Sequence, residues 1–550
     1  MIKAESTKPL DCFEGGKTMA DRYQDNSSAA RERERRLRSQ RRIAKRKKQI
    51  RRRLILLSVI VLILLAGLIL AIRLISGSSG KSSKRKDAVA AISNNSSVTA
   101  QQGTAGTASD DQSGNADTVE TQTAAPDLAK LTQEAELLAA QYDYDGAISL
   151  LEQAGGSDDP ASDTQISEAV SRYKQQRDAC VAVDVNRIPH VFFHSLINDD
   201  RAFQVDLVGP DRVRQNNAAM TTTTEFDEMI RQMYAAGYVL VSLDDMCIKS
   251  EGSDGKVHIQ PNTSLMLPAD KKAFVLSVDD LSYYHTYGIG TQGYATRMLV
   301  DRNGKPKCEY TNANGETLIG DYDVVPRLDS FIEAHPDFCY RGARGTVAMT
   351  GYNGVFGYRT NDYYKNINDE HLDYDQIEWL QQHPDFNWEE DCANAKAVAD
   401  AMKAEGWTFA SHTYGHLNAE SKDLASLQHD NERWMTVNHP ILGDIDKIIF
   451  AFGADIGHVG EYTADNQKFQ YFKNQGYNIF CNVDGNIGWT EFGDTFMRTG
   501  RVALDGFTMY QAMTETAAVH SVYAKDYEVL GISGIPSFFN PLRPTPIDSE

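Results

Sequence analysis

The sequence predicts an α/β domain in which strands and helices alternate around a parallel sheet, either a closed barrel or a doubly wound sheet. Two short runs, Phe274–Val278 and Trp407–Ser411, favour this fold because buried strands of parallel sheets are mostly apolar. The first run leads directly into Asp279 and Asp280, and the second into His412–His416. Functional sites of such folds lie where the strands end, so we expect these polar side chains to lie close together.

Charge is distributed unevenly along the 550 residues. The whole chain carries 56 Lys and Arg against 76 Asp and Glu, a formal net charge of −20. Residues 1–86 alone carry a net charge of +16, and the remainder carries −36. Because binding to phosphates requires clustered Lys and Arg, nucleic acid is not expected as a partner of the acidic part. The seven cysteines include no CxxC pair, and scattered thiols are their simplest interpretation.

Residues 54–75 are predicted to form one transmembrane helix, because Leu54–Ile72 contains no charged residue and about twenty apolar residues span a bilayer. A cleaved secretory signal would have a shorter apolar core. The preceding segment Arg31–Arg53 carries fourteen Lys or Arg and two Glu, which places the N-terminus in the cytoplasm. The basic arm, residues 1–53, is also expected to bind anionic membrane lipid. We therefore expect a single-pass cell-membrane protein whose main domain is extracytoplasmic.

Two segments separate the predicted transmembrane helix from the main domain. Residues 76–126 are expected to be a flexible, disordered tether, since large apolar side chains are almost absent from this Ser/Thr/Gly-rich stretch. Residues 127–182 show helical periodicity and are expected to form a short stalk with a single tetratricopeptide-type helical hairpin. Its turn is expected at Asp143–Gly146, and a further helical run at Ile166–Ala182. Packing of the stalk on the main domain, residues 183–550, is favoured over peptide binding because no repeat array follows.

Strand and helix signals alternate through the main domain. An insertion of about residues 301–345 interrupts them, and its Asn-Gly turns predict a polar hairpin over Gly304–Gly320. The expected elements are strands at Val191–His194, Tyr238–Val241, Phe274–Val278, Thr346–Met349 and Trp407–Ser411, and helices at Thr224–Ala236, Asp391–Glu405 and Met509–Tyr527.

The polar residues after the two strands suit a divalent metal ion. One Asp and two His supply three ligands and leave positions open for water and substrate, as catalytic zinc sites require. Because His412 and His416 are four residues apart, we expect Thr413 to cap a helix that presents His416 on the same face. Taken singly, Asp279 and Asp280 could instead cap a helix, and the histidines could be hydrogen-bonded polar residues without a metal.

Together these residues resemble the polysaccharide deacetylases of the NodB-homology type, carbohydrate esterase family 4, over roughly Ile188–Leu504. Ser277–Asp280 is similar to the family's first motif, Thr-Phe-Asp-Asp-Gly, and Ser411–His416 to its second, His-Ser/Thr-x-x-His. The resemblance implies a distorted, incomplete (β/α) barrel. It also implies hydrolytic de-N-acetylation of a cell-surface polysaccharide, of the peptidoglycan or poly-N-acetylglucosamine type.

The resemblance also implies roles for individual residues. Asp279 corresponds to the general base, and the third motif places the backbone N–H of Phe452 at the oxyanion. The implied ligands of the metal, Zn²⁺ first and Co²⁺, Mn²⁺ or Ni²⁺ as alternatives, are Asp280, His412 and His416. The sequence departs from the family at Leu281, which replaces a Gly, and at the third motif, which lacks its Pro. No general-acid His is recognisable near Arg501.

Two questions stay open from the sequence. The missing general acid could be replaced by another histidine, of which the candidates are His285, His439 and His458. Tyr352, Tyr358 and Arg359 could line a groove for sugar rings or belong to a packed loop. The alternatives to an active enzyme are a deacetylase-like glycan-binding module without turnover and an envelope scaffold that acts through its stalk. No oligomeric state follows from the sequence.

Overall fold

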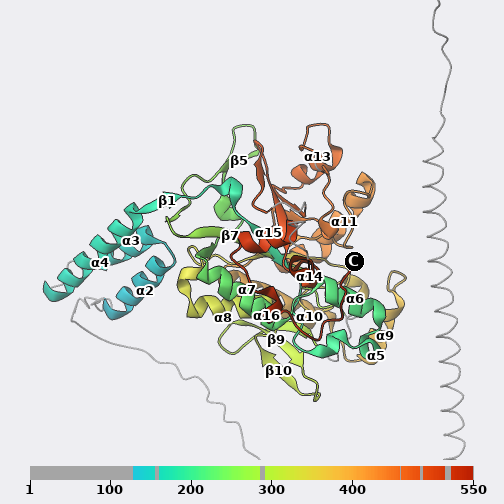
Figure 1. The fold of residues 1–550 in the computed structure, drawn as a ribbon. Helices are drawn as coiled ribbons and strands as arrows, with labels where there is room; N and C mark the ends of the chain where they lie inside the picture. The colour runs from blue at the N-terminus through green and yellow to red at the C-terminus, as the bar shows by residue number, and fades with distance from the viewer. Residues whose placement is uncertain are drawn as a thin grey trace, which may run out of the picture. The chain divides into compact units, whose positions relative to one another are not determined.

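The computed structural model describes residues 128–154, 160–284, 292–458, 460–483, 487–514 and 522–548 (Figure 1). The predicted basic arm, transmembrane helix and flexible tether lie outside these residues. Within the described ranges, every helix is too short or too polar to cross a bilayer.

Seven parallel strands form the centre of the main domain and close into a barrel. In spatial order they are β2 (His190–Phe193), β7 (Lys272–Asp279), β11 (Thr346–Met349), β12 (Thr408–Ser411), β13 (Lys447–Ile449), β14 (Ile479–Val483) and β16 (Met497–Ala503). The barrel closes because β16 pairs with β2 through Val502 and Val191. The predicted α/β fold is confirmed, and of the two sheet arrangements the barrel is the one observed.

Strand β7 pairs with three other strands and ends at the site. Its first residues pair with β3 (Tyr238–Leu240), whereas its last residues pair with β11 on the same edge. The strand is buried from Ala273 to Asp279, which accounts for its continuous apolar sequence. Val275 packs with the inward residues of neighbouring strands, so the two-residue period of a strand directs Asp279 into the barrel as well.

Helices cover the outside of the barrel, and several begin with side-chain caps. Helix α7 starts with a capping box in which Thr222 and Glu225 each accept a backbone N–H of the other. In the described residues, the helices of the main domain are α5 (Val205–Val208), α6 (Pro210–Ala219), α7 (Thr223–Ala235), α8 (Val324–Ala334), α9 (Tyr374–Gln382), α10 (Trp388–Ala404), α11 (Leu424–Val437), α12 (His439–Leu442), α13 (Gln467–Asn474), α14 (Gly506–Thr514), α15 (Val522–Val529) and α16 (Ile535–Phe538). Helices α7 and α10 confirm the predicted helices at Thr224–Ala236 and Asp391–Glu405.

Shorter strands lie outside the barrel. Two strands of the insertion, β9 (Pro306–Thr311) and β10 (Thr317–Gly320), join β8 (Ala295–Val300), which precedes it, in a three-stranded antiparallel sheet. The predicted hairpin over Gly304–Gly320 corresponds to β9 and β10. The strands outside the barrel are β1 (Cys180–Ala182), β4 (Cys247–Glu251), β5 (Val257–Pro261), β6 (Met266–Pro268), β8 (Ala295–Val300), β9 (Pro306–Thr311), β10 (Thr317–Gly320) and β15 (Thr490–Phe492). The helix predicted over Met509–Tyr527 coincides with α14 and α15 where the structure describes it, and residues 515–521 lie outside the described residues.

The segment before the barrel contains α2 (Leu128–Ala140), α3 (Tyr144–Ala154) and α4 (Pro160–Asp178), which pack in sequence order (Figure 1). The helical run predicted to Ala182 ends four residues early. Cys180–Ala182 instead form β1, because their backbone groups pair with β6. The stalk contacts the main domain directly: the Tyr142 hydroxyl donates to the carbonyl of Asp337 at 2.8 Å, and Arg341 N donates to Gln141 O at 2.8 Å.

Candidate active site

A cleft of about 490 Å³ lies at the carboxyl ends of the barrel strands. Side chains from β2, β7, β14 and β16 meet there with residues of α6 and of the loops after β2, β7, β11, β12 and β13. Its lining includes His194, Arg212, Asn216, Ala219, Met220, Asp279, Asp280, Tyr284, Tyr352, His412, His416, Phe452, Val483 and Arg501. The two motifs predicted from sequence therefore share one cavity.

Asp279 is the last residue of β7 and is only 3 % exposed. Arg501 of β16 binds both carboxylate oxygens, with Nη1 donating to Oδ1 at 2.8 Å and Nη2 donating to Oδ2 at 2.9 Å. Burial by itself raises the pKa of Asp279, but the charges of Arg501 and His412 and the Arg501 hydrogen bonds hold it well below its usual value. Asp279 is therefore a carboxylate at any physiological pH.

Asp280 and His412 present their free ligand atoms to the same space. Asp280 adopts a left-handed backbone conformation, φ 60°, which Asp tolerates better than most residues. His412 Nδ1 lies 2.7 Å from the carbonyl oxygen of Ile449. Because a carbonyl only accepts, Nδ1 carries the proton and the lone pair of Nε2 is available to a metal. Burial lowers the pKa of His412 although Asp279 and Asp280 oppose the shift, so the ring is in its neutral, ligating form.

His416 lies in a loop after β12, and the predicted helix at this position is wrong. Thr413 and His416 have left-handed backbone conformations, φ 60° and 52°, which a right-handed helix excludes. The loop is held by Asp430 of α11, whose carboxylate accepts the backbone N–H groups of Tyr414 and Gly415 at 2.7 and 2.8 Å. The four-residue spacing therefore still brings His412 and His416 to one site, but through a loop and not through the expected helix.

Asp280, His412 and His416 fit a divalent cation. Each offers one ligand atom, and these atoms lie within 4.8 Å of one another. His416 Nε2 is 3.5 Å from Asp280 Oδ2. Two imidazoles and a carboxylate are a common donor set for Zn²⁺, whose bonds to nitrogen and oxygen are roughly 2.0–2.2 Å long. The predicted metal ligands are thus brought together, whereas their binding of a metal stays a prediction.

Tyr284 stands behind the candidate metal ligand Asp280, because its hydroxyl donates to Asp280 Oδ1 at 2.6 Å. Replacing Tyr284 by Phe is expected to weaken Zn²⁺ binding by roughly 10- to 100-fold, the effect typical of removing a group that orients a ligand. Competition titration against a chromophoric chelator measures this affinity. Tyr462→Phe is the matched control, since its hydroxyl donates to Asp455 at 2.7 Å outside the cleft. Equal affinities of wild type and Tyr284→Phe would contradict the prediction.

Phe452 occupies the tight turn Ala451–Gly453 with a left-handed φ of 61°. Its side chain is 66 % exposed, and its ring lies 4.4 Å from that of His416, centroid to centroid. The next residue must be glycine, because a Cβ at Gly453 would lie 2.4 Å from the Cβ of Val483. The turn lies beside the candidate metal ligands, and its backbone role at an oxyanion stays a prediction.

Of the two alternatives left open for Tyr352, Tyr358 and Arg359, the packed loop is the one observed for Tyr358 and Arg359. Tyr352 lines the cleft and its ring stacks on Tyr284 at 5.1 Å, but Tyr358 and Arg359 are 5 % and 1 % exposed. The guanidinium of Arg359 is hydrogen-bonded inside the protein. It donates to the carbonyl of Tyr283 at 2.9 Å and to the side chain of Asn353 at 2.9 Å. This part of the loop is a packed structure.

The cleft contains a histidine that was not among the candidates for the general acid. His285 lies outside the described residues, while His439 and His458 pair with Asp444 and Glu420 and do not line the cleft. His194, directly after β2, does line it, and its charge helps to lower the pKa of Asp279. The sequence signal was its place at the end of a predicted strand, and the position of Asp279 at a strand end is the same signal.

Asp323 is a buried carboxylate that links the loop after β2 to the loop after β7. It accepts the backbone N–H of Leu196 at 2.9 Å and the hydroxyl of Tyr283 at 2.6 Å, and it also caps α8 by accepting Val324 N at 2.8 Å. Burial raises the pKa of Asp323 to about 6, although these hydrogen bonds oppose the shift.

This raised pKa predicts a pH effect on stability. The folded state binds the Asp323 proton more tightly than the unfolded state, whose Asp pKa is about 3.9. The free energy of unfolding of the wild type should therefore rise, relative to Asp323→Asn, by about 1 kcal/mol as the pH falls from 7.5 to 5. Asn keeps an oxygen for Leu196 N and Val324 N. Urea unfolding of both proteins at both pH values measures the difference, and parallel pH dependences would contradict it.

Comparison with known proteins adds one similarity. No protein-family model matches the chain, and no curated protein matches it. Among solved structures, the chain is similar to one described as a Streptococcus pyogenes deacetylase PplD in complex with acetate. The identity is 13 %, the match covers 57 % of this chain and 92 % of that chain, and the TM-score is 0.28. Because the identity and the TM-score are this low, the similarity carries no argument about function. The function is argued from the chemistry of the cleft.

Proposed function

We propose that this protein is a metal-dependent hydrolase that removes N-acetyl groups from a cell-surface polysaccharide, of the peptidoglycan or poly-N-acetylglucosamine type. The observation that carries the proposal is a single cleft that holds three converging ligand atoms beside an ionised, buried carboxylate. Hydrolysis of an amide requires an activated water, stabilisation of the oxyanion and protonation of the leaving amine. The cleft contains a group suited to each task.

Asp280, His412 and His416 would hold the cation. A bound divalent cation such as Zn²⁺ supplies Lewis acidity, which acidifies water and polarises the acyl carbonyl. The neutral imidazole of His412 is in the protonation state that ligation requires. Tyr284 orients Asp280 through its hydrogen bond.

Asp279 would accept the proton of the attacking water. Its pair with Arg501 keeps it ionised and fixes both oxygens in the barrel, 3.9 Å from His412 Nε2 at the closer one. The lowered pKa also makes Asp279 a weaker base. This weak basicity is the observation that favours the second candidate function, a glycan-binding module without turnover.

His194 would protonate the leaving amine. Its Nδ1 lies 3.1 Å from the carbonyl oxygen of Ala219, so Nδ1 donates there and Nε2 is the nitrogen left for proton transfer. The backbone N–H of Phe452 would donate to the oxyanion. The exposed ring of Phe452 and the stacked rings of Tyr284 and Tyr352 give the cleft aromatic surfaces, which suit the apolar faces of sugar rings.

The place of action we propose is the outer side of the cell membrane. The apolar segment Leu54–Ile72 and the basic segment Arg31–Arg53 support a single-pass anchor with a cytoplasmic N-terminus. A tether of about fifty residues would then let the domain reach glycan away from the membrane.

Acetate release by the full-length chain in detergent tests the proposal. The protein is stripped with a chelator and offered N-acetylglucosamine oligomers or peptidoglycan with Zn²⁺, Co²⁺, Mn²⁺ or Ni²⁺. We expect release only with metal, and equal release from the control His439→Ala, because His439 pairs with Asp444 away from the cleft. Metal binding and glycan binding without acetate would identify the binding module. Absence of metal binding would overturn the proposed site.

A further inference from the structure

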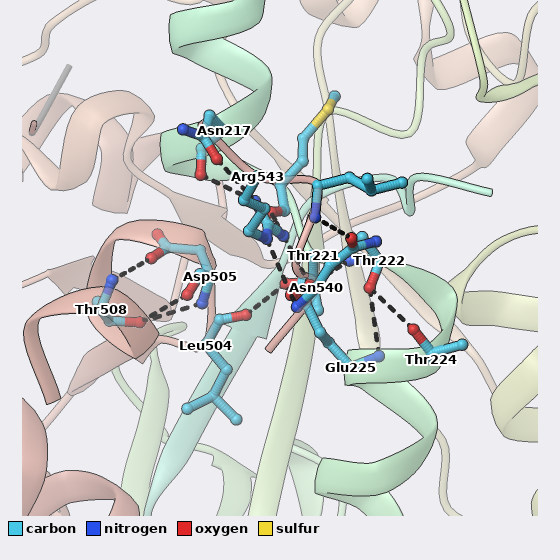
Figure 2. Close-up of polar contacts among 12 residues, drawn as sticks. Asn217, Thr221, Thr222, Thr224, Glu225, Leu504, Asp505, Thr508, Asn540 and Arg543 are labelled. Atoms are coloured by element: carbon cyan, nitrogen blue, oxygen red, sulfur yellow. Dashed lines mark hydrogen bonds and ion pairs between the residues drawn. The ribbon is translucent and has the colours of Figure 1, made fainter. Parts of the chain in front are cut away.

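The last residues of the described chain bind the backbone on either side of Ala219, whose carbonyl contacts His194. Residues 540–547, here called the C-terminal strap, insert Arg543 between α6 and α7 (Figure 2). The side chain of Arg543 is fully buried, as is that of its partner Glu225 in α7. Arg543 Nε and Nη2 donate to the two oxygens of Glu225 at 2.8 and 2.6 Å. The strap is therefore fixed to α7 by a buried ion pair.

The same guanidinium group holds the end of α6. Arg543 Nη1 donates to the carbonyl of Asn217 at 2.9 Å, and Nη2 donates to the carbonyl of Met220 at 2.7 Å. These two carbonyls flank Ala219, whose own carbonyl accepts the Nδ1 proton of His194 at 3.1 Å. One arginine thus pins the backbone on both sides of the group that orients the histidine.

We propose that Arg543 is a positioning residue for proton transfer by His194, acting through the backbone of residues 217–220. This inference rests on the function proposed above. Arg543 itself does not line the cleft, so it acts only through the segment that it holds. The Ala219 carbonyl keeps the proton on Nδ1 and points Nε2 at the leaving amine. When that carbonyl shifts, His194 loses both its tautomer and its ring orientation.

Arginine is the residue type that this role requires. Its planar fork serves a carboxylate and two carbonyls at once, whereas lysine has a single nitrogen. Helix α14 approaches the same place from the other side. A Cβ at Gly506, the first residue of α14, would lie 2.0 Å from the Asn217 carbonyl oxygen and 2.4 Å from Arg543 Nη1. The segment is therefore clamped between the strap and α14, without room for an added methyl group.

A double-mutant cycle on the full-length chain tests the proposal. Arg543→Lys keeps the charge opposite Glu225 but loses the fork, and we expect kcat for acetate release to fall roughly 10- to 100-fold with KM within two-fold. In a His194→Gln background, Arg543→Lys should cause no further loss of kcat. Arg344→Lys is the control, since Arg344 is also buried and paired, with Asp329, before β11 begins. Equal losses in both backgrounds, or a parallel rise in KM, would overturn the proposal.

Gly506→Ala is the second variant, should Arg543→Lys not fold. It pushes the Asn217 carbonyl from the opposite side and should reproduce the loss of kcat at constant KM. An undiminished kcat in folded Gly506→Ala would count against the proposal.

A labelling experiment separates this proposal from the proposed function. The rate at which diethyl pyrocarbonate modifies His194, followed by peptide mass spectrometry, does not require turnover. We expect the rate to rise at least three-fold in Arg543→Lys, because the ring is released from Ala219, and to stay constant in Arg344→Lys. An unchanged rate would overturn the positioning role. If the wild type releases no acetate, the function proposed above fails, and the labelling still tests whether Arg543 orients His194.

Discussion

Replacing Asp279 by Asn is expected to lower kcat for acetate release by about 10³-fold, within the range that removal of a general base produces. Cation binding should persist, because Asp280, His412 and His416 are intact. Stability should fall as well, since Arg501 is 1 % exposed at its side chain and would keep a buried charge without its carboxylate partner. Breaking a buried ion pair from one side costs about 3–5 kcal/mol.

The two effects of Asp279→Asn are measured separately. Initial rates at saturating metal give kcat, and urea unfolding gives the free energy of unfolding. Asp329→Asn is the matched control for loss of a buried carboxylate, because Asp329 binds Arg344 at 2.7 Å outside the cleft. It should leave kcat within two-fold. If Asp279→Asn retained more than a tenth of the wild-type kcat, another group would have to accept the proton.

Replacing His412 by Ala should remove both cation binding and turnover. Loss of a direct ligand must exceed the roughly 10- to 100-fold effect of losing a group that only orients a ligand, so we expect Zn²⁺ affinity to fall by more than about 100-fold. Acetate release should fall by at least about 10³-fold, because the Lewis acidity of the cation contributes several kcal/mol to amide hydrolysis.

Calorimetric titration of stripped protein with Zn²⁺ measures the affinity of the His412→Ala variant. His439→Ala is the control, since it removes an imidazole that pairs with Asp444 at 2.8 Å away from the cleft. Wild-type affinity in His412→Ala would show that the cation, if bound, is held elsewhere. If His412→Ala kept its affinity for Zn²⁺ but released no acetate, His412 would act in the hydrolysis step and not as a ligand of the cation.

The strands that carry the site were predictable because burial on both faces leaves a local signature. Strands β7 and β12 appear in the sequence as short, mostly apolar runs, and the boundaries observed differ from those expected by one or two residues. Parallel strands all end at the same edge of a barrel, so Asp280, His412 and His416 could be grouped without knowing their contacts.

The loops of the site carried no such signature, so the helix predicted at His416 was wrong and the place of Arg359 stayed open. The spacing of His412 and His416 is that of a helix, but Asp430, which holds the loop, comes from α11 and cannot be paired with it by local pattern. Arg359 follows an aromatic stretch and suggested a sugar groove, although its partners are backbone and amide oxygens buried beneath the cleft.

The sequence by itself determined the α/β class and the strand ends that bear the candidate metal ligands, because periodicity and apolar runs are local properties. The same local signals predict the membrane anchor, which stays a prediction, and the helices of the stalk. Only the tertiary structure decided that the sheet closes into a barrel of seven strands and that Arg501 binds Asp279 from 222 residues away. It alone brought His194 into the cleft and Arg543 onto the carbonyls of Asn217 and Met220. Pairings of this kind depend on which distant groups share a buried volume, and no local pattern encodes that choice.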